Sequence, residues 1–204
     1  MAEAFVGSQP TCRITPLGSG NVNATYLLEA GDQRHVLQRL NTDVFRQPQQ
    51  VITNLQVLNA HVQPKIRELA QCGDSLLSQR RWVMPELISP IDGPQAWHCC
   101  QEGGFWRCIS YVPNSRSADV IEDPAMAREL GTGLGLFHQL ISDLPAEQLA
   151  DTLEGFHITP RYLQAYHRAL LHTRVQPSAA ADSCIAFIRE REAFAHRLEQ
   201  AKAR

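Results

Sequence analysis

Residues 18–23, Gly-Ser-Gly-Asn-Val-Asn, lie between two segments with β-strand patterns. Small side chains let backbone N–H groups approach an anion closely, so this loop is a candidate phosphate site. Three interpretations fit two glycines at this spacing: an ordinary hairpin turn, a dinucleotide-binding loop, and a loop that covers phosphates between strands. The dinucleotide-binding loop is excluded because a strand follows instead of a helix. The other two stay open on this motif alone.

Arg39 lies on the next predicted strand and would project toward the space under this loop. Residues 36–39, Val-Leu-Gln-Arg, align with the Val-Ala-Ile-Lys strand of nucleotide-binding kinases, which puts Arg39 in place of the lysine. A guanidinium binds phosphate with two donors at once, although an exposed strand arginine is the alternative. Strict alternation turns Gln38 to the opposite face. Residues 49–67 contain no Asp or Glu, which leaves Asn54 as the nearest polar partner.

Composition limits the classes of function. The 204 residues carry a formal net charge of −2, with both signs evenly scattered. This balance gives no basic stripe for nucleic acid, and a small diffusible substrate is the simpler expectation. We expect no secretory signal, because the first residues lack a basic segment followed by an apolar run, and we find no segment long enough to cross a bilayer. The six cysteines include no Cys-x-x-Cys pair, so we expect reduced thiols and a soluble, cytoplasmic protein.

The first part of the chain predicts a sheet. Strand patterns at 12–17, 24–30 and 34–40 form an antiparallel meander, and further strand patterns return between residues 80 and 112. An apolar stripe from Pro48 to Leu69 predicts one long helix after the third strand, which Pro64 would kink or divide. Residues 1–10 are expected to be a loose lead-in. We predict a five-stranded antiparallel sheet plus this helix.

The second part predicts helices. Apolar spacing indicates helices over 124–144, 160–171 and 182–203, so the chain is α+β with a lobe boundary near residue 112. Residues 1–112 would be a nucleotide-binding N-lobe, and residues 113–204 part of a helical C-lobe. The glycines at 131, 133 and 135 fall inside the first of these helices, where close packing against another backbone is the favoured explanation.

Arg116 and Asp119 follow the last predicted strand, at the expected hinge between the lobes. An arginine there can meet a substrate or cap a turn, and the Ser-Arg-Ser composition at 115–117 favours the turn. Signatures of serine hydrolases, zinc peptidases and P-loop proteins are absent from the sequence.

Five segments together resemble the phosphotransferase family that contains aminoglycoside and choline kinases, and most closely its N-acetylhexosamine 1-kinase branch. These segments are PLGSGNVNATYLL, HVLQRLNTDVFRQPQQVITNL, GGFWRCISYVPNSRSADVIEDP, GLGLFHQLISDL and TLEGFHITPRYL. The most specific part is Gln38 to Asn41 with Val44 and Phe45. The resemblance covers most of the chain.

The resemblance implies a two-lobed protein-kinase-like fold that transfers the γ-phosphate of ATP, with Mg²⁺, to a sugar hydroxyl. The match to the family also implies which residues contact the phosphates, the adenine and the acceptor. The phosphates would be covered by Gly18, Ser19, Gly20, Asn21 and Asn23 and steadied by Arg39, the adenine bordered by Ser110, Tyr111 and Val112, and the acceptor contacted by Arg116 and Asp119.

The sequence departs from this family at its catalytic loop. None of the eight histidines has an aspartate two positions later, and no downstream metal-binding aspartate is recognised before Arg204. The missing groups accept the hydroxyl proton and hold the metal, so we assign no catalytic or metal-binding residue and expect no useful turnover from these residues alone. A non-catalytic nucleotide-binding or scaffolding module is the alternative. Apolar surface on the 126–144 helix would favour self-association.

Overall fold

The structure is a computed structural model that describes residues 1–18, 20–71, 80–174, 176 and 178–203. The chain divides into two compact units, Met1–Thr152 and Leu153–Arg204.

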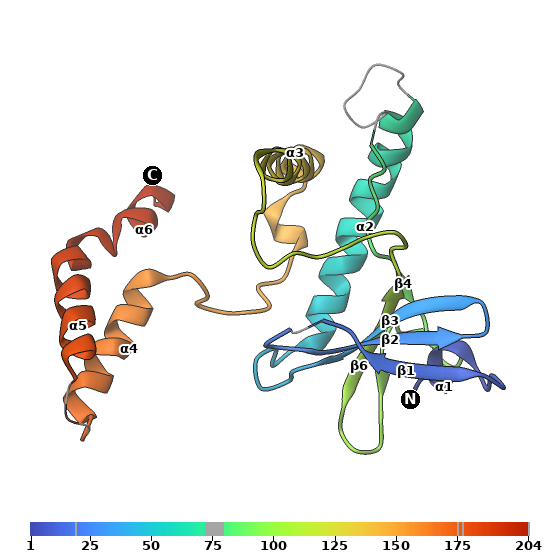
Figure 1. Ribbon diagram of the computed structural model, residues 1–204, viewed down its shortest axis with the longest axis horizontal. Coiled ribbons are helices and arrows are strands. Elements are labelled where there is room, and N and C mark those ends of the chain that lie inside the picture. Colours follow the sequence, from blue (N-terminus) through green and yellow to red (C-terminus); the bar gives the residue numbers. More distant parts are fainter. Residues whose placement is uncertain (19, 72–79, 175, 177, 204) are drawn as a thin grey trace. The chain divides into compact units, whose positions relative to one another are not determined.

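The first unit is built on an antiparallel sheet with the strand order β1-β2-β3-β6-β4, and β5 also pairs with β6 (Figure 1). The sheet has six strands instead of the five predicted, because two strands of two residues each, β4 and β5, both pair with β6 along the edge opposite β3. Prolines 85, 90 and 94 limit these strands, since proline cannot donate to a sheet ladder. The strands are β1 Cys12–Pro16, β2 Ala24–Ala30, β3 Gln33–Leu40, β4 Leu87–Ile88, β5 His98–Cys99 and β6 Phe105–Ser110.

One face of the sheet carries the best-buried side chains. Leu28, Leu37 and Cys108 are fully buried and pack against Ala2 and Phe5. Phe5 lies in a short helix, α1, Glu3–Val6. The loose lead-in predicted for residues 1–10 is therefore wrong, because these apolar side chains are covered once the sheet supplies a surface for them.

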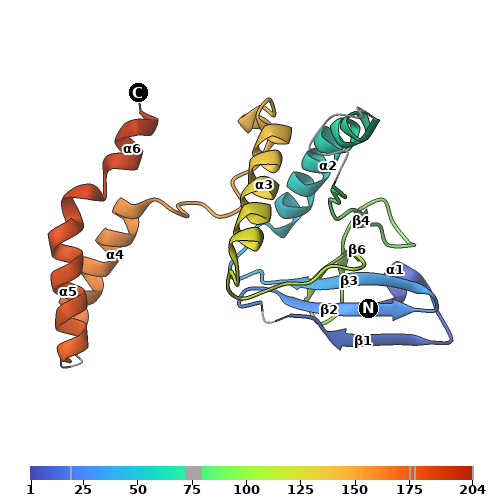
Figure 2. The ribbon, with the colours of Figure 1, turned by 45° about the horizontal axis from the view of Figure 1, so that its top comes forward.

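The opposite face meets the long helix α2, Pro48–Gln71. Figure 2 shows α2 over this side of the sheet. Ile52 of α2 is buried with Leu40 and Phe105 of the sheet. The helix continues through Pro64 without being divided. We call the two sides of the sheet the α1 face and the α2 face.

Helix α3, Pro124–Ile141, starts at Asp123, whose side chain accepts a hydrogen bond from the Met126 N–H. It lies beside α2, where the Lys65 ammonium donates to the Leu140 carbonyl at 2.9 Å. A 3-10 turn, η1 Ala146–Gln148, follows. The prediction that glycines 131, 133 and 135 pack closely against another backbone is wrong for the described residues. A Cβ added at any of the three meets no atom within 4 Å.

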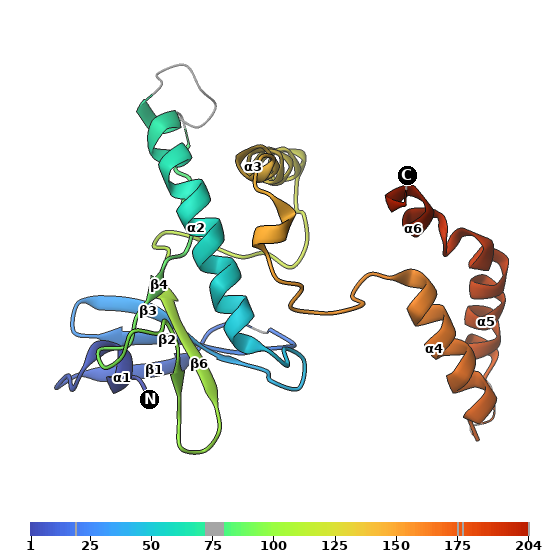
Figure 3. The ribbon, with the colours of Figure 1, turned by 180° about the vertical axis from the view of Figure 1, so that it is seen from behind.

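The second unit is helical. Helices α4, Thr159–His172, and α5, Ala179–Arg191, lie side by side (Figure 3), and the predicted helix over 182–203 is interrupted by the 3-10 turn η2, Glu192–Phe194, before α6, Arg197–Lys202. In the described part of the chain, no helix is both long and apolar enough to cross a membrane.

Candidate functional site

The glycine loop connects β1 to β2 at one end of the sheet. It begins after Leu17, whose N–H donates to the Thr25 carbonyl at 2.9 Å. Gly18 has a φ of 76°, a left-handed conformation that favours glycine. The Asn23 side chain binds the backbone after β3, because its Oδ1 accepts a hydrogen bond from the Asn41 N–H at 2.9 Å. Ser19 lies outside the described residues.

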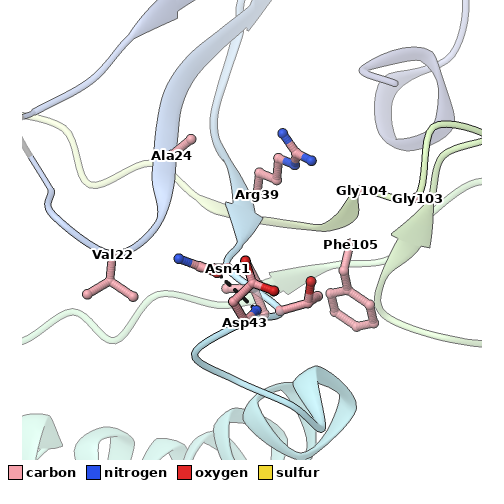
Figure 4. A pocket seen from close by; sticks show the side chains of 10 residues that line it. Val22, Ala24, Arg39, Asn41, Asp43, Gly103, Gly104 and Phe105 are labelled. Carbon is pink, nitrogen blue, oxygen red and sulfur yellow. Dashed lines mark hydrogen bonds between the residues drawn. The ribbon is translucent and has the colours of Figure 1, made fainter.

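A cavity of about 300 Å³ opens beside this loop (Figure 4). Its walls come from the loop end, the end of β3 and the turn before β6. The lining includes Val22, Ala24, Arg39, Asn41, Thr42, Asp43 and Gly103. One cationic and one acidic side chain, Arg39 and Asp43, therefore border this cavity, to which the glycine loop contributes Val22.

Arg39 belongs to the α1 face. It is paired across the sheet with Ala24 on one side and Trp106 on the other, and paired residues share a face. Its side chain is exposed and points away from Asn41 and Asp43 in Figure 4. Phosphate binding by Arg39 stays a prediction.

A second cavity, of about 580 Å³, lies on the other side of Arg39. It is lined by Cys100, His98, Glu102 and Trp106 among others. The Gly104 N–H donates to the Cys100 Sγ at 3.2 Å, and this bond lowers the pKa of the Cys100 thiol below its ordinary value. The sequence predicts only a reduced, structural thiol here, because the turn at residues 101–104 is what brings the Gly104 donor to it.

The α2 face holds a polar chain across three strands. Gln38 donates from Nε2 to the Thr25 Oγ1 at 2.9 Å, and its Oε1 accepts from Arg107 Nε at 2.9 Å and Nη2 at 2.7 Å. Arg107 is half-buried, and burial lowers its pKa from the ordinary value. No motif marks Arg107 in the sequence. Only the register of β3 against β6 puts it beside Gln38.

The residues expected to border adenine lie at the end of β6. The N–H of Ser110 donates to the Glu86 carbonyl at 2.8 Å, and its Oγ accepts the Glu86 N–H at 2.9 Å. The Tyr111 ring lies 5.2 Å from the Arg34 guanidinium carbon, and the Val112 carbonyl accepts from Ser115. Their backbone positions are thus fixed by local bonds, while contact with a nucleotide stays a prediction.

The remaining polar candidates are separate from the loop. The Asn54 amide forms two 2.8 Å hydrogen bonds with the backbone of Ala150, so the described partner of Asn54 is that backbone. Arg116 and Asp119 are exposed in the segment between β6 and α3. Their contact with an acceptor stays a prediction.

The family resemblance implies a metal ion, and the described residues offer no ready site for one. No three His, Cys, Asp or Glu side chains in that part of the chain are grouped closely enough to hold an ion. Asp43 alone stands in the smaller cavity, and a single carboxylate is a poor site for Mg²⁺ without further ligands. None of these residues is assigned to a metal.

A match to a known protein family extends over nearly the whole chain. Residues 13–203 match the phosphotransferase enzyme family. The chain belongs to this family. The fold described above, an antiparallel sheet with a long inserted helix and helices after it, is the α+β arrangement predicted from the sequence.

Among solved structures, this member of the family is similar to spectinomycin phosphotransferase APH(9)-Ia, in complex with ADP and spectinomycin. The identity is 10%, the TM-score is 0.42, and the match covers 92% of this chain. The chain spans 50% of the length of that enzyme.

Proposed function

We propose that this chain is the nucleotide-binding portion of an ATP-dependent kinase that phosphorylates a hydroxyl group of a sugar. The family match over residues 13–203 carries the proposal. The sugar is proposed to be N-acetylhexosamine-like, on the resemblance of the Gln38 to Asn41 segment to that branch. In this scheme residues 1–112 form the nucleotide lobe, and residues 113–204 begin the helical lobe that would complete it.

The glycine loop is proposed to cover the phosphates. Support comes from the left-handed Gly18 and from the cavity that opens beside Val22. Arg39 is proposed to steady the phosphates from the edge of this cavity, since no described residue pairs with its exposed guanidinium. The strand end at 110–112 is proposed to border adenine. Arg116 and Asp119 are proposed to contact the acceptor.

The catalytic groups of phosphoryl transfer are not assigned to any of the 204 residues. The sequence has no His-x-Asp segment, so the base that accepts the hydroxyl proton and the residues that hold Mg²⁺ are proposed to come from further sequence. We expect the 204 residues alone to bind ATP and to transfer phosphate at no useful rate.

Ligand binding is tested by thermal unfolding of the 204-residue chain with increasing ATP and Mg²⁺. Binding to the folded state raises the midpoint, by an amount that grows with ATP concentration. GTP and adenosine serve as comparisons. A midpoint that does not move at millimolar ATP contradicts the proposed function.

The catalytic proposal has its own test. The coding sequence past Arg204 is read in all frames, and a His-x-Asp segment there supports a kinase divided from its second part. A chain extended through that segment is then assayed with N-acetylhexosamines, choline and aminoglycosides. ATP binding without any such segment favours the alternative, a non-catalytic nucleotide-binding or scaffolding module.

Self-association is proposed through α3. Leu130 and Leu134 are 61% and 55% exposed on this helix, and exposed apolar side chains at helical spacing favour contact with another surface. Light scattering during gel filtration measures the mass of wild type and of Leu134→Ser. An unchanged monomer mass for wild type at high concentration contradicts this proposal.

A cytoplasmic location is proposed from the cysteines. Cys12, Cys99, Cys100, Cys108 and Cys184 are free thiols in the described part, as expected in a reducing compartment. Fractionation of cells that express the chain tests this, and recovery outside the cytoplasm contradicts it.

A further inference from the structure

We propose that Arg107 binds a phosphate group of the nucleotide on the α2 face of the sheet, and that Gln38 holds the guanidinium in place for this contact. This inference rests on the proposed function and names a binding residue that the sequence motifs do not mark. It also places the phosphates on the α2 face, where Arg107 takes the phosphate-binding role proposed above for Arg39 of the α1 face.

The first support is the incomplete pairing of the guanidinium. Arginine has five N–H donors, and Arg107 uses two of them, both on the single Oε1 of Gln38. Three donors have no partner among the described residues. A half-buried cation with free donors in a fixed planar arrangement is suited to bind an anion such as phosphate.

The second support is the chemistry of the partner. Glutamine and glutamate have nearly the same shape, and a glutamate at position 38 would neutralise Arg107. The amide orients the guanidinium through the same oxygen and leaves its positive charge uncompensated. Thr25 fixes the amide, because its hydroxyl accepts from Gln38 Nε2 at 2.9 Å.

The third support is the lack of acid on the covering helix. The α2 segment from Pro48 to Arg67 contains no Asp or Glu, so the helix that covers this face offers no carboxylate over its first 20 residues. A carboxylate there would compete with a bound anion. The first 20 residues of this helix therefore supply no carboxylate that could pair with Arg107 in place of a bound anion.

The fourth support is the position of Arg107 relative to the glycine loop. Thr25 is the residue with which Leu17 pairs where the loop begins, and Thr25, Gln38 and Arg107 form one row across β2, β3 and β6. Neighbouring strands are about 4.8 Å apart, so the row spans about 10 Å. A polyphosphate chain has a comparable length.

The same face also offers an apolar surface next to this row. In the next positions along the strands, Leu27, Val36 and Ile109 are half-buried apolar side chains, suited to contact an aromatic base.

The test compares ATP, inorganic tripolyphosphate and adenosine by isothermal titration with the 204-residue chain. Arg107→Gln removes the charged donor and Gln38→Glu neutralises it, so we expect each variant to weaken ATP and tripolyphosphate binding about tenfold or more. Adenosine binding should not change. Arg13→Gln, an exposed arginine on β1, makes the same change of net charge and should leave all three affinities unaltered.

The outcomes separate this inference from the proposed function. Unfolding midpoints without ligand check that each variant is folded; if Arg107→Gln fails to fold, Gln38→Glu decides, because it retains the arginine. Wild-type binding that Gln38→Glu leaves unchanged overturns the role of Arg107 and keeps the proposed function. The role of Arg107 is also overturned if Arg39→Gln loses binding while Arg107→Gln and Gln38→Glu keep it. A wild-type chain that binds neither ATP nor tripolyphosphate overturns both proposals.

Discussion

Arg39 and Arg107 lie in neighbouring rows of one sheet and project from opposite faces. Arg39 pairs with Trp106 on the α1 face, while Arg107 pairs with Gln38 on the α2 face. The long helix covers the face of Arg107, and the face of Arg39 carries the buried cluster under α1. Two positive charges near the glycine loop are therefore separated by the thickness of a sheet, and variants of each report on a different face.

The cluster on the α1 face predicts a stability difference between two leucines. Leu37 is 1% exposed and packs with Phe5, Leu28 and Cys108, so Leu37→Ala should lower the free energy of unfolding by about 2–5 kcal/mol. Leu134 is 55% exposed, and Leu134→Ala should change it by about 0.5 kcal/mol or less. Urea unfolding followed by tryptophan fluorescence measures both. Equal losses would contradict the assignment of the core to this face.

The open space along α3 predicts a stabilising substitution. Gly133 lies inside the helix, and an added Cβ meets nothing within 4 Å. Alanine there should raise the free energy of unfolding by about 1 kcal/mol, because glycine is the poorer helix former. Gly104→Ala is the contrasting variant, since its Cβ would lie 2.6 Å from the Trp106 Nε1 and should destabilise the fold. Destabilisation by Gly133→Ala would show that this face of α3 is covered in solution.

The sequence located the elements that depend on local pattern. The β2 strand has the predicted bounds, Ala24–Ala30, because a β-prone run is closed by the turn at Gly31. The α2 helix starts at the predicted proline and passes Pro64 because its apolar stripe continues beyond it. Patterns of this kind need only neighbouring residues to be interpreted.

Other features depend on contacts between distant residues. The α1 helix has four residues, and Phe5 becomes buried only against Leu28 and Leu37. Gln38 and Arg107 are 69 residues apart, and their hydrogen bonds follow from the strand register alone. Arg39 is predicted from local sequence because residues 36–39 resemble a lysine motif, whereas the position of Arg107 depends on the pairing of β3 with β6.

The contact between α2 and α3 predicts a dependence on acid. Asp143 accepts hydrogen bonds from the Lys65 ammonium and from His61, and these hold the pKa of its carboxyl at about 2, below the ordinary 3.8. A lowered folded-state pKa adds stability that is complete above about pH 4 and is lost as the pH falls toward 2. We expect wild type to unfold at a higher temperature than Asp143→Asn at pH 6 and the difference to shrink at pH 2–3. A difference that is constant over this range would contradict the ion-pair role.

The thiols predict an order of chemical labelling. Burial raises the pKa of Cys108 to about 12, so the nucleophilic thiolate is nearly absent there and reagents cannot reach the sulfur. The Gly104 N–H lowers the pKa of Cys100, so its alkylation should reach half of the maximal rate at a lower pH than that of an ordinary thiol. Iodoacetamide labelling followed by peptide mass spectrometry compares these residues with the exposed Cys12 and Cys184. In the folded protein Cys108 should stay unlabelled, and in denaturant all of these thiols should react. Labelling of Cys108 in the folded protein at the rate of Cys12 would show that the α1 helix does not cover the sheet in solution.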